Sequence, residues 1–109
     1  MAAYLIAHVK VTDQSWIPEY AKRVHEIAAT HGGKYLARSA NIKALEGDAP
    51  DATLIAVVEF PSLDAIDAFV NDPEYARFAK ARRDGSNSSF YMIDGTDVAG
   101  AIPYLPKGG

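Results

Sequence analysis

The sequence predicts one α+β domain of ferredoxin-like topology, with helices on one face of a four-stranded antiparallel sheet. Segments of strand-like alternation and of helical spacing follow one another in the order β-α-β-β-α-β. The length of 109 residues suits one domain and no more. An apolar fraction of 49% and a charged fraction of 23% are ordinary for a protein that folds around a core.

The first half of the chain contains a strand, a helix and a second strand. Residues 4–11 alternate between an apolar and a mixed face, as a half-buried strand does. Residues 17–28 repeat apolar side chains at the i, i+3, i+4 spacing of an amphipathic helix. Gly32 follows and provides the left-handed residue that commonly ends a helix. Residues 34–39 form the second strand, with residues 41–45 as a candidate continuation after a bend.

The second half repeats this pattern. Residues 53–60 are a strand whose near-continuous apolar character indicates burial on both faces. Ser62 caps the next helix, which Asp72 and Pro73 interrupt and restart as N-cap and first residue. After a turn at residues 84–87, residues 89–94 form the last strand.

This topology leaves one face of the sheet without helices. That face would carry Ile6, Ile55 and Val57, an apolar patch of the kind that monomers avoid. Packing two such sheets face to face buries both patches, so we expect a homodimer with an enclosed space between the sheets. Residues 1–95 form the expected domain. Residues 96–109 have no regular period and are expected either as an arm over the partner or as a disordered tail.

Four motifs carry a resemblance to a known family. They are His31-Gly32-Gly33-Lys34-Tyr35-Leu36-Ala37-Arg38, Leu45-Glu46-Gly47, Glu59-Phe60-Pro61-Ser62, and Ala68-Phe69 followed by Asp72-Pro73-Glu74-Tyr75. In this order and spacing the chain resembles the DUF1330 family of the dimeric α/β-barrel superfamily. The resemblance implies the fold and a dimer. It implies no activity, because the family is named for its unknown function and related superfamilies span monooxygenases, dehydratases, isomerases and haem enzymes.

A carboxylate and a guanidinium form the first candidate site. Glu59 shares a strand face with Ile55 and Val57, where a carboxylate among apolar side chains either pairs with a cation or becomes harder to ionise. Arg38 is the natural partner, because a guanidinium holds the carboxylate of Glu59 or of a ligand through two hydrogen bonds. An ion pair that only sets the sheet register or the dimer seam is the alternative. Strict alternation groups Arg38 with Leu36 and not with Tyr35.

Histidines and tyrosines complete the candidates. His8 lies on the mixed face of the first strand with Tyr4, and imidazole is the usual acid–base group near neutral pH. His31 ends the first helix inside a family motif, where it either faces a ligand or satisfies the helix terminus. Tyr75 either places a hydroxyl at a cavity mouth or packs in the core. The candidate catalytic residues are thus Glu59, His31 and His8, and the candidate substrate-binding residues are Arg38, Tyr75 and Tyr4.

Composition and the absence of certain motifs limit the partners and cofactors to be expected. A net charge of −3 gives no reason to expect nucleic acid. The apolar run at residues 54–58 is far too short to cross a bilayer, and the first residues do not resemble a signal peptide, so we expect a cytoplasmic protein without a membrane partner. The chain has no cysteine, no histidine pair at i, i+4 and no phosphate-binding glycine motif, so neither a metal nor a bound cofactor is expected.

Three functions remain open from the sequence. The first is a cofactor-independent enzyme in which Arg38 anchors a carbonyl or anionic oxygen of a small, partly apolar substrate and Glu59 or His31 moves a proton. Isomerisation, tautomerisation, lactone opening or addition of dioxygen would suit such a site. The second is a dimeric module that binds a small ligand without catalysis. The third is a dimerisation scaffold whose polar residues complete the interface.

Overall fold

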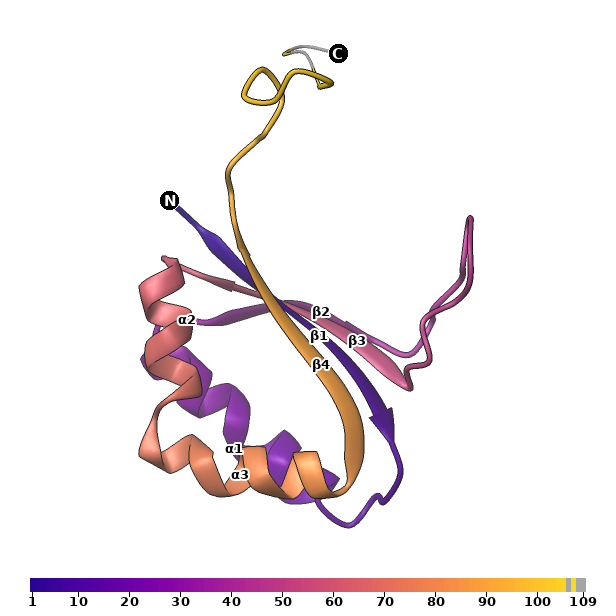
Figure 1. Cartoon of the computed structure of the whole chain (residues 1–109). Coiled ribbons are helices and arrows are strands. Elements are labelled where there is room, and N and C mark those ends of the chain that lie inside the picture. Colours follow the sequence, from indigo (N-terminus) through magenta and orange to yellow (C-terminus); the bar gives the residue numbers. More distant parts are fainter. Residues whose placement is uncertain (106, 108–109) are drawn as a thin grey trace.

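The four strands form one antiparallel sheet in the order β2-β3-β1-β4 in a computed structural model, which describes residues 1–105 and 107. All three helices lie on one face of this sheet (Figure 1). In chain order the elements are β1 (Ala3–Val11), α1 (Ile17–Thr30), β2 (Lys34–Ser39), β3 (Leu54–Phe60), α2 (Leu63–Val70), α3 (Pro73–Asp84) and β4 (Ser86–Asp94). The predicted ferredoxin-like fold is confirmed, with the second helix divided in two.

The helix boundaries follow from local chemistry. Gly32 ends α1 with a φ of +81°, in the region that favours glycine. Ser62 caps α2 by accepting a hydrogen bond of 3.1 Å from the Ala65 amide. Asp72 caps α3 in the same way through the Glu74 amide, and Pro73 occupies its first turn, where a missing N–H is harmless. The predicted interruption at Asp72 and Pro73 is therefore confirmed.

The core lies between the helices and one face of the sheet. The central strands contribute Leu5, Val58 and Phe60, each at most 5% exposed. Against them pack the buried side chains of the helices: Val24, Ile27 and Ala28 of α1, Ile66 and Phe69 of α2, and Tyr75, Phe78 and Ala79 of α3. Aromatic rings link these layers, since Phe60 of β3 has its centroid 5.6 Å from that of Phe69 of α2. Phe69 in turn stacks on Tyr75 of α3 with centroids 4.4 Å apart.

None of the helices formed by residues 1–105 covers the opposite face of the sheet. Its central positions are half-buried or exposed apolar side chains with polar ones at the corners: Tyr4, Ile6, His8, Ile55, Val57, Glu59, Tyr91 and Ile93. We call these residues the open face. The prediction that β3 is buried on both sides is wrong for the single chain, because Ile55 and Val57 on this face are only half-buried.

Two element boundaries differ from the prediction. Residues 41–45 do not prolong β2, and they belong to a loop that projects beyond the sheet between β2 and β3 (Figure 1). β4 begins at Ser86, earlier than predicted, because Ser86 pairs with Val11 and Asn87 pairs with Lys10. Pairing with β1 thus recruits residues whose own composition favours a turn.

The segment after β4 runs away from the sheet and helices (Figure 1). Within it, Ile102 and Leu105 form an isolated antiparallel bridge. Pro106, Gly108 and Gly109 of the expected tail lie outside the described residues. Its role as an arm over a partner stays a prediction.

Candidate functional site

An apolar pocket of about 230 Å³ lies between the sheet and the helices α1 and α3. It is on the helix-covered face, whereas the sequence predicted a space against the open face. Aliphatic and aromatic side chains form most of its wall. Six of the lining residues carry polar or charged groups: Trp16, Tyr20, Tyr35, Tyr75, Arg38 and Arg82.

Small side chains on the central strands open this space. Ala56 of β3 pairs with Ala7 of β1, and both point to the helices and are only 6% exposed. In the neighbouring strands Arg38 lies opposite Ala56, and Phe90 lies opposite Ala7. One row across the sheet therefore reads Arg38, Ala56, Ala7 and Phe90, with two methyl groups at its centre. Larger side chains at these two positions would fill the pocket.

A β-bulge in β2 determines where Arg38 lies. Tyr35 pairs with Val58 and Ala37 pairs with Val57, so Leu36 is the extra residue. Beyond the bulge Arg38 pairs with Ala56 and shares the helix-covered face with Tyr35, over whose ring its guanidinium lies at 4.5 Å. The expectation from strict alternation is therefore wrong.

The predicted pair of Arg38 with Glu59 does not form for the same reason. Glu59 lies on the open face, between Lys34 of β2 and Tyr4 of β1. Arg38 lies on the other side of the sheet, and no ion pair joins it to Glu59 among the described residues. The sheet itself separates the two charges.

Three tyrosines present phenol groups to the pocket. The hydroxyls of Tyr20 and Tyr75 are 3.0 Å apart and share a hydrogen bond, although Tyr75 is only 2% exposed. Burial, with Tyr75 beside it, raises the pKa of Tyr20 far above its usual range. Burial likewise raises the pKa of Tyr35, although the Arg38 cation opposes this shift. The phenols of Tyr20 and Tyr35 therefore keep their protons near neutral pH and act as hydrogen-bond donors.

Arg82 brings a cation to the other edge of the pocket. It belongs to α3, is 7% exposed, and its guanidinium lies 4.0 Å from the ring centroid of Phe90. Its Nη1 donates to the hydroxyl of Ser88, and its Nε has no hydrogen-bond acceptor within the described part of the chain. Since β2 and β4 are the two outer strands, Arg38 and Arg82 approach the pocket from opposite edges of the sheet.

The lining defines what the pocket does chemically. It contains cations and phenol donors, and no histidine or carboxylate is among its residues. Such a set stabilises negative charge on an oxygen atom in an environment with little water. It provides no group that takes up a proton near neutral pH.

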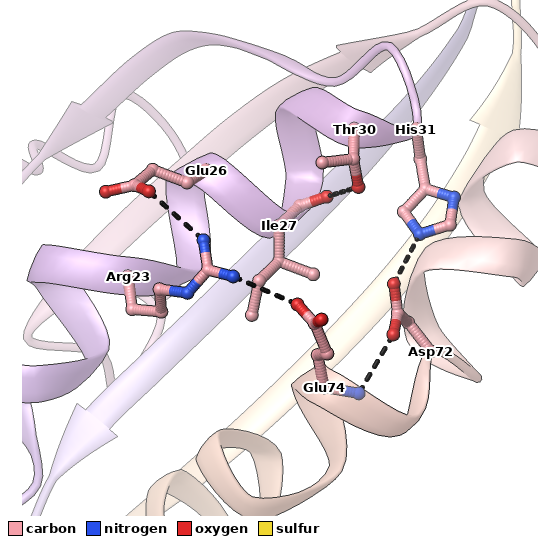
Figure 2. Close-up of polar contacts among 7 residues, drawn as sticks. All are labelled: Arg23, Glu26, Ile27, Thr30, His31, Asp72 and Glu74. Carbon is pink, nitrogen blue, oxygen red and sulfur yellow. Dashed lines mark hydrogen bonds and ion pairs between the residues drawn. The ribbon is translucent and has the colours of Figure 1, made fainter.

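His31 lies outside this pocket and joins two helices (Figure 2). Its Nε2 donates to the Asp72 carboxylate at 2.7 Å, which connects the end of α1 to the start of α3. That hydrogen bond, together with the one from the Glu74 amide, lowers the pKa of Asp72. Beside it Arg23 reaches both Glu26 at 3.1 Å and Glu74 at 2.9 Å, which adds a second link between α1 and α3.

The six predicted site residues thus separate into three groups. Arg38 and Tyr75 meet in the pocket. His31 lies at the helix junction, and Glu59, His8 and Tyr4 lie on the open face, where the His8 ring meets Tyr91 edge-on with centroids 5.9 Å apart. The structure does not unite the three candidate catalytic residues with the two residues in the pocket.

Sequence reasoning missed Arg82, Tyr20 and Trp16 as pocket residues. Arg82 falls on the apolar stripe of α3, seven residues after Tyr75, and an arginine at a core position is the signal that marks it. Trp16 and Tyr20 are one helical turn apart, and their rings meet edge-on at 5.1 Å. Two aromatic side chains at this helical spacing are the signal that marks them, and both line the pocket.

Two further properties concern the described residues as a group. No three histidine or acidic side chains within residues 1–105 and 107 come together in a way that would hold a metal ion. None of the helices in the described chain is long and apolar enough to cross a bilayer.

Solved structures share this fold at low sequence identity. A protein of unknown function from Rhodopseudomonas palustris superposes with a TM-score of 0.69 at 16% identity, over 88% of this chain and 83% of that one. SnoaB, a cofactor-independent oxygenase from Streptomyces nogalater, superposes with a TM-score of 0.62 at 12% identity, over 88% and 94%. An antibiotic biosynthesis monooxygenase superposes with a TM-score of 0.56 at 10% identity, over 89% and 100%. At these identities the likeness shows the fold alone.

Sequence comparison places the chain in a family. It matches no curated protein. The profile of the domain of unknown function DUF1330 matches residues 2–96, which is most of the 109-residue sequence and includes every strand and helix described above. The chain therefore belongs to the DUF1330 family.

Proposed function

We propose that this protein binds a small, partly apolar molecule with a carbonyl or anionic oxygen in the pocket between the sheet and the helices. The observation that carries the proposal is the pocket of about 230 Å³ itself, whose apolar wall ends in arginines at both edges of the sheet. A few polar groups in an otherwise apolar concave site are typical of a small-molecule site. Arg38 and Tyr75 keep their predicted role as ligand-binding residues in this proposal.

The chemistry proposed for the pocket is stabilisation of negative charge. Phenols that keep their protons donate hydrogen bonds to a ligand oxygen, and the arginines add positive charge. The pocket lining contains no histidine or carboxylate, so no residue of the lining is proposed to remove a proton from the ligand. His31 is proposed as a structural link between α1 and α3, in line with its hydrogen bond to Asp72.

Oxygenation is the second candidate function. An anion-stabilising pocket suits a substrate acidic enough to ionise by itself, whose electron-rich anion then reacts with dioxygen. The fold shared with a cofactor-independent oxygenase supports this candidate as an analogy. Oxygen uptake in the presence of electron-rich phenols would support it, and uptake that the protein does not accelerate would exclude those substrates.

The fluorescence of Trp16 can report ligand binding, because Trp16 is the single tryptophan of the sequence and lines the pocket. We expect toluene and benzoate, as single-ring probes, to change the Trp16 fluorescence in a saturable way. The variant Ala56→Leu, which fills the pocket, should lose this response. The matched variant Ala29→Leu on the exposed side of α1 should keep it. A wild-type protein whose fluorescence does not respond at millimolar probe would contradict the proposal.

A second copy of the chain is the proposed partner of the open face. The centre of that face is apolar, with Tyr91 56% and Ile93 53% exposed, and a patch of this kind is unusual on a monomer. A two-fold dimer would cover it with the same patch of the partner. Glu59, His8 and Tyr4 would then be interface residues, and the catalytic roles of Glu59 and His8 stay predictions.

Light scattering during size-exclusion chromatography tests the dimer. We expect wild type to elute as a dimer at micromolar concentration and Val57→Lys, which puts a charge at the centre of the open face, to elute as a folded monomer. Ala29→Lys should remain a dimer. A wild-type protein that is monomeric at this concentration would contradict the proposal.

A further inference from the structure

Arg82 carries a buried positive charge that no carboxylate in the described part of the chain neutralises. Its side chain is 7% exposed, and no acidic group of residues 1–105 or 107 lies within ion-pair distance of it. A guanidinium remains charged at any physiological pH. An unpaired charge away from water is unfavourable for the folded protein, so a counter-charge from outside the chain is expected.

The contacts of Arg82 show which part of the guanidinium is available. One flat face lies over the ring of Phe90 at 4.0 Å. Nη1 donates to the Ser88 hydroxyl, which in turn lies 3.2 Å from the Ser86 hydroxyl. Nε is buried and has no acceptor in the described chain. The edge that carries Nε is therefore left for a ligand, and a carboxylate binds such an edge through two parallel hydrogen bonds.

The phenols beside Arg82 favour the same kind of ligand. Tyr20 is close enough for the Arg82 charge to act on its hydroxyl group. The hydrogen bond between Tyr20 and Tyr75 uses one of their two hydroxyl hydrogens, so the pair retains one O–H that donates elsewhere. Arg38, at the opposite edge, is exposed, and water weakens the field of its charge. The strongest site for an anion is therefore at Arg82.

The size of the pocket limits the rest of the molecule. Drug-sized ligands occupy pockets of about 300–1,000 Å³, and an apolar cavity of about 150 Å³ accommodates benzene. The pocket of about 230 Å³ lies between these values. It accommodates one ring, or a short branched chain, with one small polar substituent.

We propose that the ligand is a monocarboxylate on a single ring or short branched chain, with its carboxylate on the Nε edge of Arg82. This inference rests on the proposed function, since it needs the pocket to bind a small molecule. It adds the charge of the ligand and the residue that recognises it. Arg82 is then the residue that distinguishes an acid from its neutral analogue of the same shape.

Three probes of similar size test the inference through the fluorescence of Trp16. Benzoate carries the charge, benzamide has nearly the same shape without it, and toluene reports on the apolar pocket alone. We expect wild type to bind benzoate at least about tenfold more tightly than benzamide, because charge-assisted hydrogen bonds are the stronger ones. In Arg82→Met, which keeps a long apolar stem over Phe90, this preference should disappear while toluene binding remains. Arg83→Met removes the exposed neighbouring arginine and should keep the preference.

Each failure has a distinct meaning. If toluene binds but wild type binds benzoate no more tightly than benzamide, the inference is overturned and the proposed pocket stands. A preference for benzoate that survives in Arg82→Met also overturns it, because another group then recognises the anion. If none of the three probes binds wild type, both proposals fail. Should Arg82→Met not fold, the comparison of benzoate with benzamide on wild type still decides the question.

Discussion

The variant Ala56→Leu tests the origin of the pocket most directly. Ala56 is 6% exposed, lies at the centre of the sheet opposite Ala7, and lines the space of about 230 Å³. Leucine would place three further carbons in that space. At about 0.8 kcal/mol for each buried CH₂, their burial would stabilise the fold by about 2.4 kcal/mol. For a domain of this size that corresponds to a rise in melting temperature of roughly 10–20 °C.

Two measurements on the same samples check this expectation. Thermal denaturation should show the higher melting temperature, and toluene should no longer change the Trp16 fluorescence of the variant. Ala29→Leu is the matched control, because Ala29 is exposed on α1 and its replacement should change stability by no more than about 0.5 kcal/mol. If Ala56→Leu melts below wild type and still binds toluene, the two central alanines do not create the binding space and the reasoning is wrong.

Two further predictions concern hydrogen bonds. Tyr75→Phe would leave the buried Tyr20 hydroxyl without its partner, so urea denaturation should show a loss of about 1–3 kcal/mol in unfolding free energy. The double variant with Tyr20→Phe should recover most of this loss, and an equal loss in the double variant would contradict this account. The hydrogen bond from His31 lowers the pKa of Asp72, so the Asp72 carboxylate stabilises the folded state above its unfolded-state pKa of about 3.9 and loses this effect as the pH falls through the lower folded-state value. Asp72→Asn keeps an N-cap but removes the charge, so wild type should be the more stable of the two at pH 7. In acid titrations of stability, the difference in unfolding free energy between them should shrink below about pH 4. A difference independent of pH would show that the charge of Asp72 does not stabilise the fold.

The fold was largely predictable because the elements have strong local signals. The alternation of residues 4–11, the helical spacing of residues 17–28 and the Asp72-Pro73 restart each correspond to an observed element. The start of β4 was not predictable, because Ser86 and Asn87 favour a turn and only their pairing with β1 makes them a strand. Local propensity does not contain that information.

The site was predictable only in part, for a related reason. Arg38 and Tyr75 were identified as candidates. The face of the sheet on which Arg38 lies depends on the bulge at Leu36, however, and no pattern in residues 34–39 marks that bulge. The expected pairing of Arg38 with Glu59 therefore failed. Arg82 was missed, although its place on the buried stripe of α3 gives it an environment unlike that of the exposed Arg83 beside it.

The bulge at Leu36 also affects how this family can diverge. Deleting this one residue would restore regular alternation, and Tyr35 and Arg38 would both keep their places on the helix-covered face. A regular strand that kept all of these residues would instead turn Arg38 to the open face, so the bulge admits one extra residue without moving the cation. Relatives that lack the extra residue would carry the arginine on the same face, one position closer to the tyrosine in sequence, so an alignment needs a gap here before it shows the shared site.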